Sequence, residues 1–200
     1  MRFFDILDAL KSEYKGNCSI RKNGTLLLCP GKIPRSRHML FKPLCDEYIQ
    51  EYLIEQYNNN FPKEYIEFLK YSNGANLHTV KMKTDKIEFA SNLFVIFGLP
   101  LTPPFGRPKD EEEPYDIRIE DLGRHKEISK KWLKCGTYTR NYNFNVQNDI
   151  FIDTETNKVY ACIKNKNEIV DSWESLDECF CSIFESFSDS KLEYYFKSNR

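Results

Sequence analysis

The chain has 200 residues, of which 40% are hydrophobic and 14% aromatic, so it carries enough apolar material for the core of one domain and does not belong to the disordered class. Its 29 lysines and arginines nearly balance its 30 aspartates and glutamates, giving a net charge of -1. That balance excludes a generally basic nucleic-acid binder and a strongly acidic nucleic-acid mimic. Any partner must therefore be recognised through local surfaces.

The N-terminal residues predict an amphipathic helix, because Phe3, Leu7 and Leu10 share one helical face. Asp5 and Asp8 interrupt the apolar run that a signal peptide would need, and no uncharged apolar run approaches the ~18 residues of a membrane span. Seven cysteines without a C-x-x-C pair are typical of reduced thiols in a protein core. We therefore expect a cytoplasmic protein that does not enter a membrane.

Residues 18–29, CSIRKNGTLLLC, predict a β-hairpin, because Asn23-Gly24 lies between two β-prone runs. The proline-containing and basic residues 30–37 predict a connector without regular structure. A second amphipathic helix is then expected over about 44–53.

The stretch FPKEYIEFLKYSNGANLH, residues 61–78, predicts a short helix with both ends marked. Pro62 suits the first turn, where its missing N–H costs nothing. Asn73-Gly74 supplies the left-handed residue that commonly ends a helix. Four aromatic or apolar side chains share one face and are expected to be buried: Phe61, Tyr65, Phe68 and Leu69.

The next segments alternate between apolar and highly charged sequence. Residues 86–98 favour a strand, whereas residues 99–116, with five prolines, predict an exposed loop. A charged helical turn is expected within 117–131. Residues 132–163 alternate apolar and polar side chains as half-buried strands do, and a hairpin is expected around residues 154–157.

The final helix is predicted by a capping box, Ser175 and Glu178, that precedes one continuous apolar stripe. The stripe is expected to pack on the sheet and consists of Leu176, Cys179, Phe180, Ile183, Phe184 and Phe187. The charged tail, residues 191–200, is expected to fray.

Together these elements resemble the SUKH superfamily, Smi/Knr type, over roughly residues 44–187. The resemblance consists of the order of the elements: the helix FPKEYIEFLKYSNGANL, the short NLFVIFGL, a variable loop, DIFIDTETNKVY, and a tryptophan before the last helix. The family's helix motif maps onto Phe61, Pro62, Tyr65, Phe68, Leu69, Asn73 and Gly74, with Asp153 and Trp173 in the later elements. Phe61 stands where leucine is usual, and Ala75 where a second glycine is common.

The resemblance implies a single α+β domain in which helices pack on a mixed, largely antiparallel sheet. Residues 44–190 would form the SUKH-like core, residues 1–43 an N-terminal helix and hairpin packed on the same domain, and residues 191–200 a frayed tail. It implies a binding scaffold, and it does not imply catalysis. Bacterial relatives are similar to immunity proteins of polymorphic toxin systems, and fungal relatives to regulators of cell-wall synthesis and signalling.

An enzyme would need a nucleophile, a base or a metal constellation, and the sequence offers little of this kind. The three histidines, His38, His78 and His125, share no ligand spacing, so we expect exposed or structural roles for them. Asp149 and Asp153 would face the same side of a strand and could present oxygens to a metal, but aspartates that cap turns explain them as well. We expect no catalytic residue, metal or cofactor.

The segment DEEEPYD is the most distinctive surface feature and a candidate partner-binding site. It joins a dense negative charge to a tyrosine, a residue favoured at interfaces. An ordinary solvated charge run explains the same residues: Asp110, Glu111, Glu112, Glu113, Tyr115 and Asp116.

The sequence thus leads to a cytoplasmic immunity protein that blocks a cognate intracellular toxin, such as a nuclease, by surface complementarity. A regulatory scaffold for signalling or cell-wall proteins is the alternative. In either case the partner is a protein, no direct nucleic-acid binding is expected, and the chain would be a monomer or a weak dimer.

Overall fold

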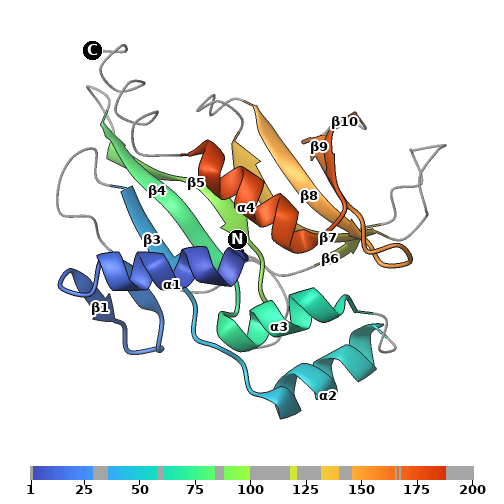
Figure 1. The fold of residues 1–200 in the computed structure, drawn as a ribbon, viewed down its shortest axis with the longest axis horizontal. Helices are drawn as coiled ribbons and strands as arrows, with labels where there is room; N and C mark the ends of the chain where they lie inside the picture. Colours follow the sequence, from blue (N-terminus) through green and yellow to red (C-terminus); the bar gives the residue numbers. More distant parts are fainter. Residues whose placement is uncertain are drawn as a thin grey trace.

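The structure is a computed structural model that describes residues 2–28, 36–57, 61–83, 88–99, 118–120, 132–139, 146–164, 166 and 168–187. Helices and strands follow one another along the chain as shown in Figure 1. They are α1 (Phe3–Glu13), β1 (Cys18–Ile20), β2 (Leu26–Leu28), β3 (Ser36–Leu40), α2 (Asp46–Tyr57), α3 (Lys63–Tyr71), β4 (Ala75–Lys83), β5 (Glu88–Ile96), β6 (Arg118–Glu120), β7 (Trp132–Thr139), β8 (Gln147–Asp153), β9 (Val159–Ile163), β10 (Ile169–Trp173) and α4 (Leu176–Ser186).

The described strands form one open sheet with the order β1-β2-β3-β4-β5-β7-β8-β9-β10, and β6 pairs with β7. The first half of β7 pairs with β6 and its second half with β5. Every described pairing is antiparallel. The expected α+β class is therefore confirmed, and the described sheet is antiparallel rather than mixed.

Helices α1, α3 and α4 lie on one face of the sheet, and α2 packs beside α3 (Figure 1). The main core fills the space between these helices and the sheet, with Leu7, Tyr65 and Phe180 among its buried side chains. Burial of such aromatic and branched side chains removes large apolar areas from water, which is the main stabilising term. The helix layer is therefore held by the core beneath it.

The opposite face of the sheet carries separate apolar clusters, since successive side chains in a strand point to alternate faces. Leu27, Met39 and Phe41 form one of them. Trp132 and Phe151 belong to another, with the Tyr160 ring stacked on the Trp132 ring at 4.4 Å between centroids.

The N-terminal region confirms two predictions and corrects a third. Helix α1 buries its expected face, and the hairpin forms with Cys18 opposite Leu28. Residues 36–40, however, are a strand and not part of a connector, because β2 and β4 pair with β3 on both sides. Pairing with two neighbours outweighs a local composition that favours a loop.

Gly74 adopts the expected left-handed conformation, with φ +88°, but it does not end the helix. Helix α3 ends at Tyr71, and Ser72 is extended. Glycine is needed at position 74 because a Cβ there would lie 2.8 Å from the Ile96 carbonyl oxygen. The residue therefore permits a close approach between the start of β4 and the end of β5.

Two further strands differ from expectation. The sequence does not predict β4, because Asn76, His78 and Thr79 give it a polar appearance, yet it pairs along most of its length with β5. Arg118–Glu120 form β6, whereas the sequence predicts a helical turn within 117–131. The rest of that segment lies outside the described residues, as does most of the predicted loop, residues 99–116, and the tail, residues 191–200.

The β8–β9 hairpin and the last helix agree with prediction. Ile152 pairs with Val159, and Asn157 takes a left-handed conformation in the connecting turn. At the start of α4, Ser175 Oγ accepts a hydrogen bond from Glu178 N at 3.1 Å. The Glu178 carboxylate accepts from Glu174 N rather than from Ser175 N, so only half of the expected capping box forms.

The described cysteines are free thiols that divide between core and surface. Cys135, Cys162 and Cys179 are buried, whereas Cys18 and Cys45 are exposed. The prediction of core thiols therefore holds for part of the set.

Candidate functional site

The residues of the helix motif on α3 have structural roles. The side chains of Phe61, Tyr65, Phe68 and Leu69 are buried, and Pro62 precedes the first turn of α3. Tyr65 Oη lies 2.6 Å from the Phe97 carbonyl oxygen and 3.0 Å from that of Cys135. The motif therefore fixes α3 to strand β7 and to the end of β5.

Asn73 strengthens the same connection. Its side chain donates to the Leu99 carbonyl oxygen at 2.8 Å and accepts from Leu99 N at 2.6 Å. These paired bonds use both the NH2 group and the oxygen of the buried amide, and they fix the orientation of the side chain. The chain leaving β5 is thus tied to the end of α3.

The two aspartates considered as possible metal ligands bind other groups of the protein. Asp149 Oδ2 lies 2.8 Å from Lys134 Nζ in a largely buried ion pair. Asp153 caps the β8–β9 turn by accepting from Glu155 N and from Thr156 Oγ1, both at 2.9 Å. Among the described residues, no group of three or more His, Cys, Asp or Glu side chains could hold a metal ion.

Two other predicted residue sets have different outcomes. Trp173 lies in β10, is partly buried and packs against the main core. The acidic candidate site, Asp110, Glu111, Glu112, Glu113, Tyr115 and Asp116, lies outside the described residues. Its role as a partner-binding surface remains a prediction from sequence.

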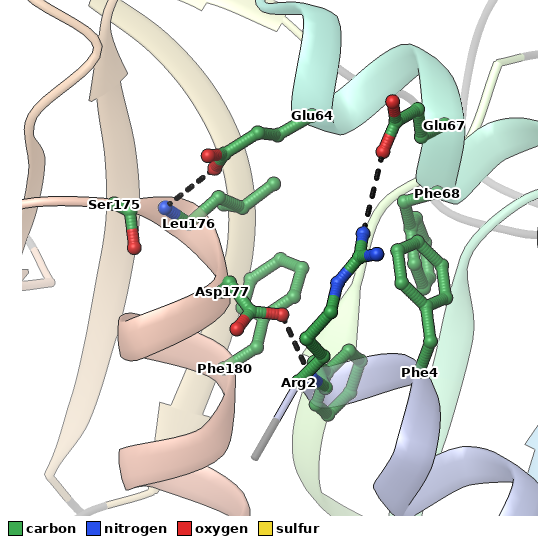
Figure 2. A pocket seen from close by; sticks show the side chains of 10 residues that line it. Arg2, Phe4, Glu64, Glu67, Phe68, Ser175, Leu176, Asp177 and Phe180 are labelled. Atoms are coloured by element: carbon green, nitrogen blue, oxygen red, sulfur yellow. Dashed lines mark hydrogen bonds and ion pairs between the residues drawn. The ribbon is translucent and has the colours of Figure 1, made fainter.

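The described residues contain a pocket where the N-terminal ends of α1 and α4 meet α3 (Figure 2). Its volume is about 270 Å³. Aromatic rings line its walls and charged side chains surround them; these residues are Arg2, Phe3, Phe4, Glu64, Glu67, Phe68, Ser175, Leu176, Asp177 and Phe180. We call this cavity the helix-junction pocket.

Two carboxylates of the helix-junction pocket hold the starts of helices. Glu64 Oε2 accepts from Leu176 N at 3.1 Å, and Asp177 Oδ1 accepts from Phe3 N at 2.7 Å (Figure 2). The first N–H groups of a helix have no partner within the helix and form its positive end, so a carboxylate is stabilised there. These contacts join the three helices and fix the positions of the two acidic groups.

The third carboxylate faces the only basic side chain that lines the described pocket. Arg2 Nη2 lies 3.6 Å from Glu67 Oε2, and the guanidinium carbon lies 5.4 Å from the centre of the Phe4 ring (Figure 2). Both side chains of the ion pair are mostly exposed, at 66% and 61%. With three carboxylates against one guanidinium, the pocket lining is negative overall.

A second polar cluster lies under the C-terminal half of α4. The rings of His38 and His78 meet edge to face, with centroids 4.7 Å apart, and His78 also lies 4.6 Å from Phe184 and 5.5 Å from Phe187. Tyr14 stacks on His38 from α1. Both histidines are buried, which agrees with the structural alternative of the expectation and not with the exposed one; His125 lies outside the described residues.

The backbone explains how His78 enters this cluster. Its φ of 51° places it in the left-handed region, at a bulge between β3 and β4, and its N–H donates to His38 Nδ1 at 3.3 Å. Both ring nitrogens of His78 are buried without a hydrogen-bond partner. Burial lowers the pKa of His38 to about 4 and that of His78 well below its usual value, with proximity to His38 adding to the second shift.

The sequence predicts Phe3, Phe68, Leu176 and Phe180 as buried helix residues, but it does not predict that they line a pocket together with charged side chains. Arg2, Glu67 and Asp177 are far apart in the chain, and only folding brings them together. The sequence does contain a signal for two of the carboxylates. Glu64 and Asp177 lie in the first turns of predicted helices, where acidic residues interact favourably with the helix dipole.

Comparison of the chain with protein-family models, with curated proteins and with solved structures gave no match. Within the described part of the chain, no helix combines the length and the apolar character that crossing a membrane requires.

Proposed function

We propose that the chain is a non-catalytic, SUKH-like protein-binding domain that acts as an immunity protein and neutralises a cognate intracellular toxin. The order of sequence motifs supports the family, and the helix-junction pocket supports binding. The pocket places two exposed carboxylates, those of Glu64 and Glu67, near the partly buried Phe4 ring, which is the chemistry of an interface that anchors one partner side chain.

The pocket is held by a rigid scaffold, which favours binding with little loss of conformational freedom. Glu64 and Asp177 are each fixed by a backbone N–H of a neighbouring helix. Beneath them, Tyr65 and Asn73 tie α3 to the sheet. A surface that is ordered before binding keeps more of its contact energy as affinity.

The charge of the pocket favours a basic partner surface. Nucleases recognise a polyanion and therefore carry basic surfaces, to which a negative patch is electrostatically complementary. Blocking such a surface would neutralise the toxin without any covalent step. The acidic segment at residues 110–116 would add to the same attraction if it functions as the sequence suggests.

Co-expression tests the proposed function. The reading frame next to the gene of this chain is expressed from an inducible promoter, with and without the chain, and growth is followed after induction. We expect growth arrest by the neighbour alone, rescue by the chain, and co-purification of the two proteins. Absence of both rescue and co-purification contradicts the proposal, and co-purification without rescue favours a regulatory scaffold.

A further inference from the structure

We infer that the helix-junction pocket is the receptor for an arginine side chain of the bound partner, at a place where the chain's own Arg2 already acts as a substitute. The inference rests on the proposed function, because it specifies which chemistry the partner presents to this surface.

The walls of the pocket suit a guanidinium group. Phe4 and Phe68 lie on one side of the pocket and Phe180 on another (Figure 2). Phe68 and Phe180 are only 2% and 1% exposed, so the partly buried Phe4 ring is the one among these on which a planar guanidinium can stack. An acidic side chain would be repelled by the carboxylates, and an apolar one would leave them without a partner.

The carboxylates can accept hydrogen bonds from a second guanidinium. The described contacts use one oxygen each of Glu64, Glu67 and Asp177. A carboxylate accepts at two oxygens, and arginine presents its donors in a fork that matches them. Each of the three groups thus retains one oxygen that these contacts do not use.

The size of the cavity favours one side chain over a larger molecule. Pockets for small-molecule ligands and cofactors usually span about 300–1,000 Å³, and this one is about 270 Å³. Arginine is also among the residues that most often act as energetic anchors at protein interfaces.

Arg2 shows that the site already accepts a guanidinium. Its group contacts Glu67 and lies over the Phe4 ring, so both elements of the expected recognition are present within the chain. The ion pair is exposed, and exposed pairs contribute little to stability, so a partner's arginine can displace Arg2 at small cost. Arg2 would then compete with the partner.

The inference is tested by NMR titration of the full chain with acetyl-Gly-Arg-Gly-amide. The citrulline peptide serves as the probe without charge, and acetyl-Gly-Glu-Gly-amide as the probe of opposite charge. We expect the arginine peptide alone to shift the amide signals of Phe3, Leu176 and Asp177, with millimolar affinity. Equal shifts with citrulline, or shifts with the glutamate peptide only, overturn the inference.

Two variants sharpen the test. Arg2→Ala removes the competitor and should tighten arginine-peptide binding severalfold, whereas Glu67→Gln should weaken it severalfold. Asp46→Asn is the matched control, since Asp46 belongs to another exposed ion pair, 2.9 Å from Lys70, on α2 and α3. Weaker binding of the arginine peptide by Arg2→Ala would show that Arg2 does not compete for the pocket and would overturn the inference. Amide dispersion in the spectra verifies the fold of each variant.

Failure of this inference is distinguishable from failure of the proposed function. If the chain rescues growth but shows no arginine-dependent shift, the pocket is not an arginine receptor and the immunity function stands. If the chain binds arginine but does not rescue growth, the pocket is an arginine receptor and its partner is not the toxin. When both results are positive, Glu67→Gln should also reduce the affinity for the toxin.

Discussion

The two ends of α4 contact very different polar groups, although phenylalanines of the same helix pack at both. At its N-terminal end, carboxylates stand next to Phe180 and accept hydrogen bonds from backbone N–H groups. At its C-terminal end, His78 lies against Phe184 with both ring nitrogens unpartnered. Charge is thus accommodated at one end and excluded at the other.

Burial is the cause of the lowered pKa of His38, and it opposes any preference of the α4 end for a cation. The C-terminal end of a helix favours a cation by up to ~2 kcal/mol in partly buried geometries. Yet the pKa of His38 is lowered to about 4, which corresponds to a larger opposing free energy of about 3 kcal/mol. The charged side chains of the pocket are exposed or partly exposed, whereas burial disfavours the protonated form of the two histidines.

The largest expected effect comes from removing the aromatic wall of the pocket. Phe180 is 1% exposed, and its ring centroid lies 5.2 Å from that of Phe3 and 5.9 Å from that of Phe68. Phe180→Ala should lower the free energy of unfolding by about 3–5 kcal/mol, as cavity-forming core substitutions do. Urea denaturation followed by circular dichroism measures it. Phe184→Ala, at a partly buried position, should cost less, and an equal or larger loss would contradict the comparison.

Lowering the pH should destabilise the folded chain through the buried histidines at the C-terminal end of α4. Above pH 6.5 histidine is neutral in both the folded and the unfolded chain, so its protonation does not change the free energy of unfolding. Between pH 6.5 and about 4 only the unfolded chain binds the proton at His38, so the free energy of unfolding should fall with pH by about 3 kcal/mol. His78 shifts in the same direction. Urea midpoints measured from pH 7 to pH 4 test this.

The variant His78→Asn isolates the histidine contribution from that of the carboxylates. Asparagine tolerates the left-handed backbone found at position 78 and has no proton to bind in this range. The slope of stability against pH should therefore be smaller than in the native chain. An unchanged slope would mean that the acid sensitivity arises elsewhere.

A smaller effect is expected from the cap of α4 beside the pocket. Ser175→Ala removes the acceptor for Glu178 N and should cost about 1 kcal/mol of stability. Ser182→Ala is the control, since Ser182 is exposed within the same helix and alanine favours helix formation. Thermal denaturation of both variants gives the difference, and equal midpoints would show that Ser175 does not cap the helix.

The elements with local signals could be predicted from sequence. The helices at 3–13, 63–71 and 176–186 have an apolar face at helical spacing, and the hairpins at 18–28 and 147–163 have turn residues between β-prone runs. Each of these signals lies within a few residues of the element that it predicts. Local propensity and tertiary packing agree there, so the sequence is sufficient.

The strands β3 and β4 could not be predicted, because their stability arises from neighbours. His38 and His78 look like surface residues in the sequence, and only the bulge between the two strands turns His78 toward α4. The helix-junction pocket has the same origin. It needs α1, α3 and α4 together, and Phe3 lies 174 positions from its hydrogen-bond partner Asp177.

The place of the N-terminal hairpin has a practical consequence for dissecting the chain. Strands β1, β2 and β3 precede residue 44 and continue the sheet beyond β4. A shortened chain that begins near residue 44 would leave the nine-residue strand β4 with one row of N–H and C=O groups unpaired. An exposed edge strand of this kind pairs readily with strands of other molecules. We therefore expect the shortened chain to self-associate, so it would not be a useful isolated binding domain.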